Sequence, residues 1–229
     1  MTPPTEDHGA ARRRMADEIA QQLRETVAET GIAALDPRVM AALRGVAREC
    51  FVPPAQAAEA CANRPLDIGR GQTISQPFIV ALMTQLLDLQ PGDRVLEVGT
   101  GSGYQAAVLC ALAGEVYSIE IVRPLARAAA RALRAAGCRN LHTRSADGHG
   151  GWPEAAPFDA IIVTAAAREV PQPLLDQLAP GGRLVIPLGT PGAMQTLYRY
   201  EKGAREDGLG AVSRRRVLDV RFVPFTRAG

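Results

Sequence analysis

Glycines gather at one strand-to-helix turn in a pattern that could bind a nucleotide-like ligand. The stretch VLEVGTGSGYQAAVL places Gly99, Gly101 and Gly103 after an apolar strand and before a helix. Glycine at such a turn lets the backbone bend sharply and lets a ligand approach main-chain atoms closely. The loop therefore predicts a cofactor site, although turns of this kind also occur for packing alone.

Acidic residues follow the glycine loop in an order that suits a particular cofactor. Glu120 ends the next strand, where a carboxylate can accept hydrogen bonds from ribose hydroxyls, and Asp147-Gly148 follows the next helix, where an adenine amine could be bonded. Glu97, at the end of the first strand, adds a charge that disfavours a pyrophosphate and favours a cation. S-adenosylmethionine, which carries a sulfonium and no phosphate, is therefore favoured over NAD. The alternative is that Glu97 and Glu120 are only solvated strand ends.

A polar turn, Gln72-Thr73-Ile74-Ser75-Gln76-Pro77, precedes the glycine loop. A serine hydroxyl there could hydrogen-bond a carboxylate oxygen of an acceptor. Alternatively, Thr73 and Ser75 could cap the helix predicted from near Phe78. Ser75 has no Gly-x-Ser-x-Gly context, and no histidine lies in a triad signature, so a nucleophilic serine is not indicated.

Alternating strands and helices must position these residues. Apolar runs alternate with helical patterns, which predicts an α/β fold with a doubly wound, mainly parallel, Rossmann-like sheet. An edge strand that could pair antiparallel is predicted at Val217–Phe225. The runs are Val95–Val98, Val116–Ile119, Ala160–Val163 and Leu184–Leu188, and the helices are Phe78–Leu87, Gln105–Ala113, Pro124–Ala136 and Gln172–Leu178.

The N-terminal third predicts a helical cap on this core. Residues 1–14 are rich in proline and arginine and are expected to form a disordered tail. Helices are expected at Met15–Thr30 and from Asp36-Pro37 to about Glu49, and a loose segment at Glu201–Gly210. We expect one domain at 15–229, with helices and lead-in at 15–70 and the core at 71–229.

The composition argues against several classes of protein. The net charge of +2 favours neither nucleic acid nor an anionic membrane as a partner. No apolar run is long enough to span a bilayer, and the four cysteines are scattered without a CxxC pair, so neither a metal site nor a disulfide framework is expected. Together with the lack of a signal-peptide segment, this predicts a cytoplasmic protein. The sequence leaves the oligomeric state open, with a monomer as the simplest expectation.

Several motifs, in this order, resemble the protein-L-isoaspartate O-methyltransferase family: IGRGQTISQP, VLEVGTGSGYQAAVL, FDAIIVTAAA, LAPGGRLVIPLG and the terminal VRFVPF. The resemblance implies a class I methyltransferase core with N-terminal helices and a C-terminal extension. It also implies methyl transfer from S-adenosylmethionine to the free α-carboxylate of L-isoaspartyl residues in damaged proteins and peptides. That carboxylate is already ionised at neutral pH, so the enzyme needs no general base and acts mainly by positioning the reactants.

The resemblance assigns roles to individual residues. Ser75 is the expected catalytic residue, as a hydroxyl that orients the acceptor carboxylate. Substrate contacts are expected at Ser75, Thr164, Ala165 and Val223. Cofactor contacts are expected at Thr73, Ile74, Glu97, Gly99, Thr100, Gly101, Ser102, Glu120, Asp147, Gly148 and Thr226.

Two departures from the family pattern keep other functions open. Ala146 stands where the family usually has glycine, and Asp67 puts an acid near the expected acceptor mouth. A related methyltransferase acting on an aspartate of one dedicated ribosomal peptide therefore remains an alternative. A non-catalytic binding protein and a nicotinamide dehydrogenase are further alternatives, which the intact acids and the GxGxG spacing disfavour.

Overall fold

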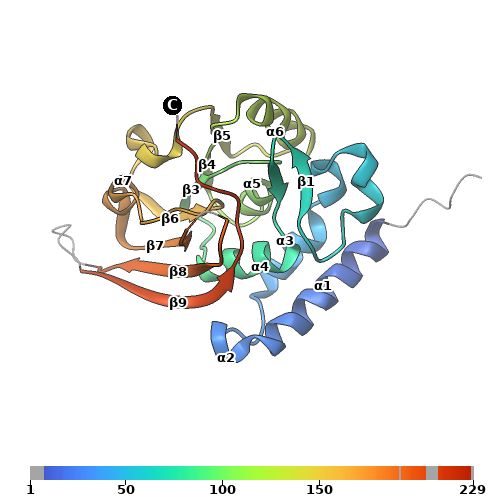
Figure 1. Cartoon of the computed structure of the whole chain (residues 1–229), viewed down its shortest axis with the longest axis horizontal. Coiled ribbons are helices and arrows are strands. Elements are labelled where there is room, and N and C mark those ends of the chain that lie inside the picture. The colour runs from blue at the N-terminus through green and yellow to red at the C-terminus, as the bar shows by residue number, and fades with distance from the viewer. Residues whose placement is uncertain (1–7, 191, 205–210, 228–229) are drawn as a thin grey trace, which may run out of the picture.

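In the computed structural model, residues 8–190, 192–204 and 211–227 are described, and they confirm the α/β architecture (Figure 1). Within these residues a seven-stranded sheet has the order β5-β4-β3-β6-β7-β8-β9. The first five strands in this order pair in parallel, whereas β8 and β9 add antiparallel at the edge. The strands are β3 (Arg94–Val98), β4 (Glu115–Ile119), β5 (Leu141–Arg144), β6 (Phe158–Val163), β7 (Leu178–Leu188), β8 (Gln195–Lys202) and β9 (Val212–Val220).

The central strands are buried on both faces, which explains their uninterrupted apolar sequence. In β6, Ala160 and Ile162 face one hydrophobic cluster, whereas Ile161 and Val163 face a second. The first cluster is completed by the N-terminal helices and the second by residues around α7. The helices are α1 (His8–Glu25), α2 (Val27–Thr30), α3 (Pro37–Gly45), α4 (Pro77–Leu86), α5 (Tyr104–Cys110), α6 (Arg123–Ala135) and α7 (Gln172–Asp176).

The N-terminal helices pack on the core as a cap, and two of their expected bounds are corrected. Helix α1 begins at His8, so the predicted tail is wrong for residues 8–14, and the rest of it lies outside the described residues. Apolar side chains on one face of α1 are fully buried, which stabilises these additional turns. Helix α3 ends at Gly45, and the expected continuation to Glu49 is replaced by the 3-10 turn η1 (Arg48–Phe51). The predicted cap of α3 is confirmed, since Asp36 Oδ1 accepts the amide of Arg38 at 2.7 Å.

Four short or polar strands escape the sequence patterns. Strands β1 (Leu66–Gly69) and β2 (Gln72–Ile74) form a small antiparallel ribbon before the core, and β5 is only four residues long. Strand β8 covers part of the segment expected to be loose, up to Lys202, and residues 205–210 lie outside the described residues. The predicted C-terminal strand lies earlier than expected, because β9 ends at Val220 and the chain then leaves the sheet.

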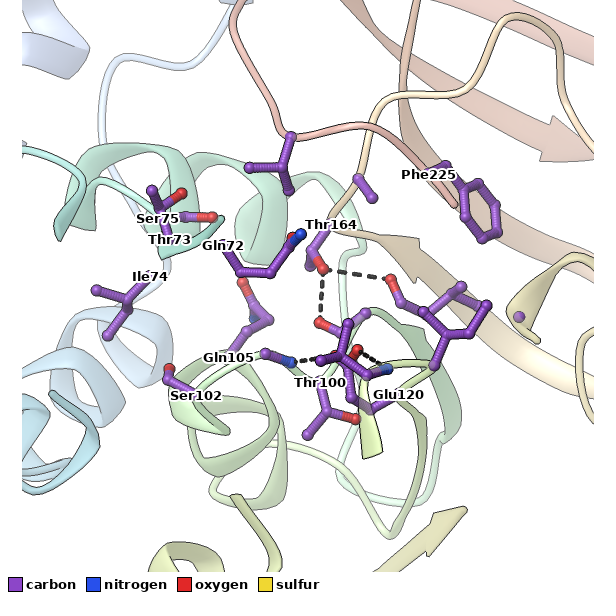
Figure 2. A pocket seen from close by; sticks show the side chains of 18 of the residues that line it. Gln72, Thr73, Ile74, Ser75, Thr100, Ser102, Gln105, Glu120, Thr164 and Phe225 are labelled. Carbon is purple, nitrogen blue, oxygen red and sulfur yellow. Dashed lines mark hydrogen bonds between the residues drawn. The ribbon is translucent and has the colours of Figure 1, made fainter. Parts of the chain in front are cut away.

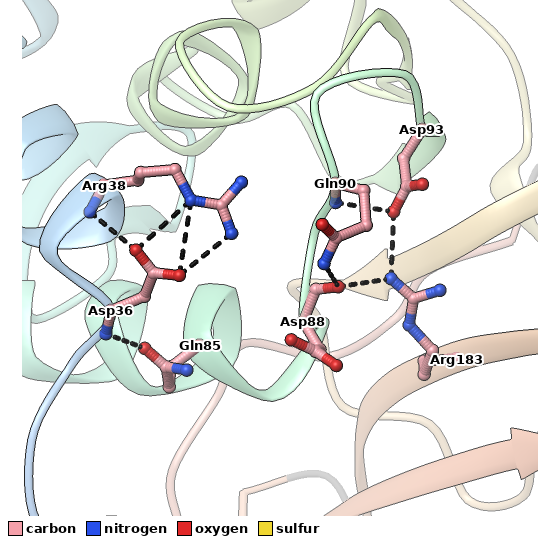
Figure 3. Close-up of polar contacts among 7 residues, drawn as sticks. All are labelled: Asp36, Arg38, Gln85, Asp88, Gln90, Asp93 and Arg183. Atoms are coloured by element: carbon pink, nitrogen blue, oxygen red, sulfur yellow. Dashed lines mark hydrogen bonds and ion pairs between the residues drawn. The ribbon is translucent and has the colours of Figure 1, made fainter.

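Two polar junctions fasten the cap and strand β7 to the end of α4 and to the loop that follows it (Figure 3). The Asp36 amide donates to Gln85 Oε1 at 2.6 Å, which ties the start of α3 to α4. On the other side, Arg183 of β7 donates to the carbonyl oxygens of Leu87 and Asp88 and forms an ion pair with Asp93 at 2.9 Å. The last turn of α4 is thus tied to the cap, and the connection that follows it is tied to β7.

The 3-10 turns η2 (Pro54–Glu59), η3 (Gly148–Gly150) and η4 (Pro153–Ala155) complete the fold. Among the described helices, none combines the length and the apolar character that a membrane crossing requires.

Candidate active site

The glycine loop, the turn before α4 and the C-terminal segment line one pocket (Figure 2). Its floor comes from the ends of β3 and β4, where parallel strands present their carboxyl ends, as expected for a ligand site in an α/β sheet. In Figure 2, Thr73 and Ser75 lie on one side of the pocket, Phe225 on the other and Thr100 and Glu120 between them. Residues separated by about 150 positions in sequence therefore meet around one space.

The glycine loop fits tightly against the next strand. Gly99 has φ of +102°, and a Cβ atom there would lie 2.4 Å from Thr164 Oγ1. The Thr164 hydroxyl instead donates toward the carbonyl oxygens of Gly99, at 2.7 Å, and Val98, at 3.2 Å. Only glycine meets both requirements, so this position confirms the predicted close turn.

Glu120 lies where the sequence predicts a ribose contact. Its side chain lines the pocket, and its two carboxylate oxygens accept the amides of Gly101, at 2.7 Å, and Val122, at 2.8 Å. These bonds fix the carboxylate, and each oxygen keeps a lone pair for another donor. Among the described residues lining the pocket, none is basic and Glu120 is the one acid. This lining suits a ligand with hydroxyls and a positive charge better than one with phosphates.

Glu97 does not reach the pocket, which corrects one expected cofactor contact. It is fully buried beneath the loop, where Ser118 Oγ donates to it and Thr100 Oγ1 lies 2.5 Å from the same Ser118 oxygen. Burial raises the pKa of Glu97 to about 8. Burial therefore favours the neutral carboxyl group over the charged form that the sequence analysis expected beside a cation. Glu97 supports the loop through Ser118 and Thr100.

Asp147 is also outside the pocket lining, whereas its neighbour Gly148 lines the pocket. Asp147 Oδ1 accepts the backbone amide of His149 at 2.9 Å and lies 2.8 Å from His149 Nδ1. Asp147 Oδ1 is thus engaged by the following histidine, and the contact of Asp147 with an adenine stays a prediction. Sequence reasoning did not use His149, because a lone histidine after a glycine carries no recognisable motif.

Ser75 lies at the boundary between two cavities. It lines the pocket and also a neighbouring groove of about 390 Å³, and Thr73, Thr164 and Val223 line both spaces as well. Pro65, Gln76, Phe78, Ile79, Gln22, Met194 and the segment Leu218–Phe222 complete the groove. The alternative role of Thr73 and Ser75 as helix caps is wrong. The N-cap residue of α4 is Gln76, and its side chain makes no hydrogen bond to the first turn of the helix. The Phe78 amide donates to Asn63 Oδ1 at 3.0 Å instead.

A buried arginine binds the main chain of the Ser75 turn. Arg48 is fully buried, donates through Nη2 to the Ser75 carbonyl oxygen at 2.9 Å and through Nε to the Ala60 carbonyl oxygen at 2.7 Å. Its guanidinium lies 4.9 Å from the centre of the Tyr104 ring. Burial lowers the pKa of Arg48 to about 10, so the side chain remains charged at neutral pH. No motif in the sequence marks this residue.

The structure brings most of the predicted site residues together around the pocket. Sequence reasoning missed several apolar and amide-bearing members of the lining, because such side chains form no chemical motif. The predicted residues in the lining are Thr73, Ile74, Ser75, Gly99, Thr100, Gly101, Ser102, Glu120, Gly148, Thr164, Ala165, Val223 and Thr226, and the missed ones are Gln72, Val80, Val98, Tyr104, Gln105, Ile119, Ile121, Val122, Pro224 and Phe225.

Comparison with known proteins identifies the family. Residues 18–228 match the family described as protein-L-isoaspartate(D-aspartate) O-methyltransferase. The chain belongs to this family. It is 53% identical to protein-L-isoaspartate O-methyltransferase 2 of Syntrophobacter fumaroxidans, with 96% of this chain and 87% of that relative covered. It is 55% identical to protein-L-isoaspartate O-methyltransferase 1 of Cupriavidus necator, with 92% and 80% covered.

A solved structure supports the fold of this methyltransferase family member. The protein-L-isoaspartate O-methyltransferase of Plasmodium falciparum, in complex with S-adenosyl-L-homocysteine, superposes with a TM-score of 0.76. It is 24% identical, and the match covers 96% of this chain and 99% of that one. At this identity the likeness concerns the fold, which agrees with the predicted class I methyltransferase architecture.

Proposed function

We propose that this chain transfers a methyl group from S-adenosylmethionine to the free α-carboxylate of L-isoaspartyl residues in damaged proteins and peptides. Membership of the protein-L-isoaspartate O-methyltransferase family supports the reaction and the methyl donor. The structural observation that most directly supports the proposal is that four residues line both the pocket and the neighbouring groove: Thr73, Ser75, Thr164 and Val223. A cofactor in the pocket and a polypeptide in the groove would meet at these four residues.

The pocket residues fit S-adenosylmethionine. Glu120 would bond the ribose hydroxyls, the glycine loop would receive the cofactor against its main chain, and Gly148 would adjoin the adenine. When bound, the cofactor supplies an electrophilic methyl carbon on a positively charged sulfur. The absence of basic side chains among the described lining residues spares that charge from repulsion.

On the acceptor side, the residues need only orient a group that is already reactive. An α-carboxylate with an ordinary pKa of about 3.5 is ionised at neutral pH, so no proton must be removed. Ser75 Oγ makes no hydrogen bond with another described residue, which leaves the hydroxyl able to donate to one acceptor oxygen. Holding the reacting atoms in line can contribute roughly 7–11 kcal/mol to lowering a barrier. Arg221, exposed at the groove, adds a positive charge on the acceptor side.

The acid that raised doubt about substrate preference pairs with Thr73 in the β1–β2 ribbon. Asp67 is exposed in β1, and its Oδ1 accepts the amide of Gly69 in the same strand at 2.7 Å. It lines neither the pocket nor the groove. General recognition of isoaspartyl chains is therefore favoured over one dedicated peptide. None of the four cysteines forms a disulfide within the part of the chain that the structure describes, which supports the proposal of a reducing compartment such as the cytoplasm.

The test is a methyl-transfer assay on matched isoaspartyl and aspartyl peptides. We expect methyl esters on the isoaspartyl peptide and few on its aspartyl counterpart. Ser75→Ala should keep its affinity for S-adenosylhomocysteine and lose about 10- to 100-fold in kcat, the value of one charge-assisted hydrogen bond. Ser213→Ala, which changes an exposed serine of β9, is the matched control. Equal labelling of both peptides would contradict the substrate assignment, and unchanged kcat in Ser75→Ala would contradict the role of the hydroxyl.

A further inference from the structure

The segment after β9 forms one wall of the pocket with little support from the sheet. Val223, Pro224, Phe225 and Thr226 all line the pocket. A single bridge holds their backbone, in which the Ala166 amide donates to the Val223 carbonyl at 2.8 Å and the Phe225 amide donates to the Ala166 carbonyl at 2.9 Å. Within the described residues, no backbone hydrogen bond follows Phe225. The end of the wall therefore depends on how the Phe225 side chain is held.

His149 holds the Phe225 ring. The two rings are stacked, with their centroids 3.8 Å apart and their planes at 19°. Phe225 lies across the pocket from Ser75 (Figure 2), so the stack fixes the wall opposite the acceptor turn. Stacked aromatic pairs stabilise more than the burial of their surface alone would.

The His149 ring is itself fixed in orientation. Asp147 Oδ1 lies 2.8 Å from His149 Nδ1 and also accepts the His149 backbone amide. The His149 side chain is only 18% exposed, and its face covers Phe225. A contact with a carboxylate on one side and a stack on the other leaves the imidazole little rotational freedom.

The loop that carries His149 is packed directly against the floor of the pocket. A Cβ atom on Gly148 would lie 2.3 Å from Val98 Cγ1 at the end of β3 and 3.5 Å from Phe225 Cε2. Val98, Gly148 and Phe225 all line the pocket. A displacement of the Phe225 ring would therefore open the cavity at the place where Gly148 and Val98 meet it.

From this arrangement, which rests on the proposed function, we infer that His149 is a positioning residue: it holds the Val223–Thr226 wall closed on the bound cofactor. His149 does not line the pocket, and it acts through Phe225. Because Val223 of the same wall also lines the groove, the stack additionally sets the shape of the boundary that the acceptor meets. The main consequence is on cofactor affinity.

Calorimetric titration with S-adenosylhomocysteine, alongside initial rates on the isoaspartyl peptide, tests this inference. We expect His149→Ala to weaken S-adenosylhomocysteine binding about 3- to 10-fold, the equivalent of one aromatic stack. His149→Phe keeps a ring on Phe225 and should recover most of the affinity, whereas His149→Asn keeps a polar partner for Asp147 and should not. His142→Ala is the matched control, because His142 stacks on Tyr117 at 4.6 Å and 19° but lies outside the pocket.

A merely structural role is separated by two further measurements. Phe225→Ala should weaken binding as His149→Ala does, and the double variant should be no weaker than Phe225→Ala alone. The melting temperature of His149→Ala should stay close to that of the wild type. If the wild type binds S-adenosylhomocysteine and His149→Ala binds it with the same affinity, this inference is wrong and the proposed function is unaffected. If the wild type does not bind S-adenosylhomocysteine, both this inference and the proposed function are wrong.

Discussion

At the scale of single residues, the site depends on groups that orient an acceptor without activating it. Ser75 presents an unengaged hydroxyl, and its own carbonyl oxygen is bound by the buried Arg48. The position of the hydroxyl is therefore determined by a side chain that touches neither the pocket nor the groove. A reaction that gains its rate from alignment should be sensitive to such a residue.

Replacing Arg48 tests this dependence. Arg48→Lys keeps a positive charge but cannot reach the carbonyl oxygens of Ser75 and Ala60 with the same fork, so the turn should lose its fixed position. We expect kcat on the isoaspartyl peptide to fall about 10- to 100-fold while the Kd for S-adenosylhomocysteine changes little, since one charge-assisted bond is lost. Initial-rate kinetics and calorimetry measure the two effects.

Arg64→Lys provides the control for Arg48→Lys. Arg64 forms an ion pair with Glu59 on the exposed surface, and within the described part of the chain its side chain makes no hydrogen bond or ion pair with the turn at Ser75. Its replacement should leave both kcat and Kd unchanged. Equal losses of cofactor affinity and kcat in Arg48→Lys would show that the arginine stabilises the fold without acting on the acceptor turn.

At the scale of elements, an arginine of β7 fastens the connection between α4 and β3 to the sheet (Figure 3). Arg183 makes two bonds to carbonyl oxygens and one ion pair with Asp93, and the side chains of this pair are only 14% and 12% exposed. Arg183→Ala leaves the Leu87 carbonyl and the Asp93 carboxylate without this donor. We expect the free energy of unfolding to fall by about 2–4 kcal/mol, as measured by urea denaturation.

The exposed pair on the other side of Figure 3 serves as the control. Arg38→Ala removes a guanidinium that contacts Asp36, whereas the backbone amide of residue 38 still donates to the Asp36 cap. Exposed pairs contribute little to stability, so the urea midpoint should match that of the wild type. If Arg183→Ala also keeps the urea midpoint of the wild type, the contacts of Arg183 do not contribute to the free energy of unfolding.

Elements with a long apolar pattern were predictable, and polar ones were not. Strands β3, β4 and β6 are buried on both faces, so their composition alone predicted them. In strand β8, charged and polar residues interrupt the apolar ones. The ribbon of β1 and β2 is held by pairing between two short segments. In the site, the glycine loop and Glu120 followed from local spacing. Arg48 and His149 did not, because each acts through a partner distant in sequence or through a stack that only the folded chain creates.

At the scale of the whole molecule, the sheet carries a polar group in its interior directly beneath the loop that forms the pocket. Glu97 and Ser118 are opposed in the parallel pair of β3 and β4, and both are fully buried. One carboxyl oxygen, Oε1, is buried and has no partner among the described residues. An ionised carboxylate would be costly there, so folding selects the protonated form.

The stability of the whole domain should therefore depend on pH through this one residue. The pKa of Glu97 is about 8 in the folded chain, against an ordinary value of 4.5, mainly because of burial. A raised pKa means that the folded state binds the proton more tightly than the unfolded state. Its contribution is complete below pH 4.5 and is lost as the pH rises toward 8, by up to a few kcal/mol. Glu97→Gln keeps the shape and removes the titration, so this loss should disappear.

Urea denaturation at about pH 5 and about pH 8.5 measures the difference between wild type and Glu97→Gln. Between the lower and the higher pH, the free energy of unfolding of Glu97→Gln should rise relative to that of the wild type. Glu18→Gln removes an exposed carboxylate of α1 and should run parallel to the wild type. If Glu97→Gln also runs parallel, the carboxyl group titrates normally in the folded chain, and the neutral support assigned to it beneath the glycine loop is wrong. If this difference shifts as expected, the pocket rests on a proton that the fold itself retains, and its loop should loosen first at alkaline pH.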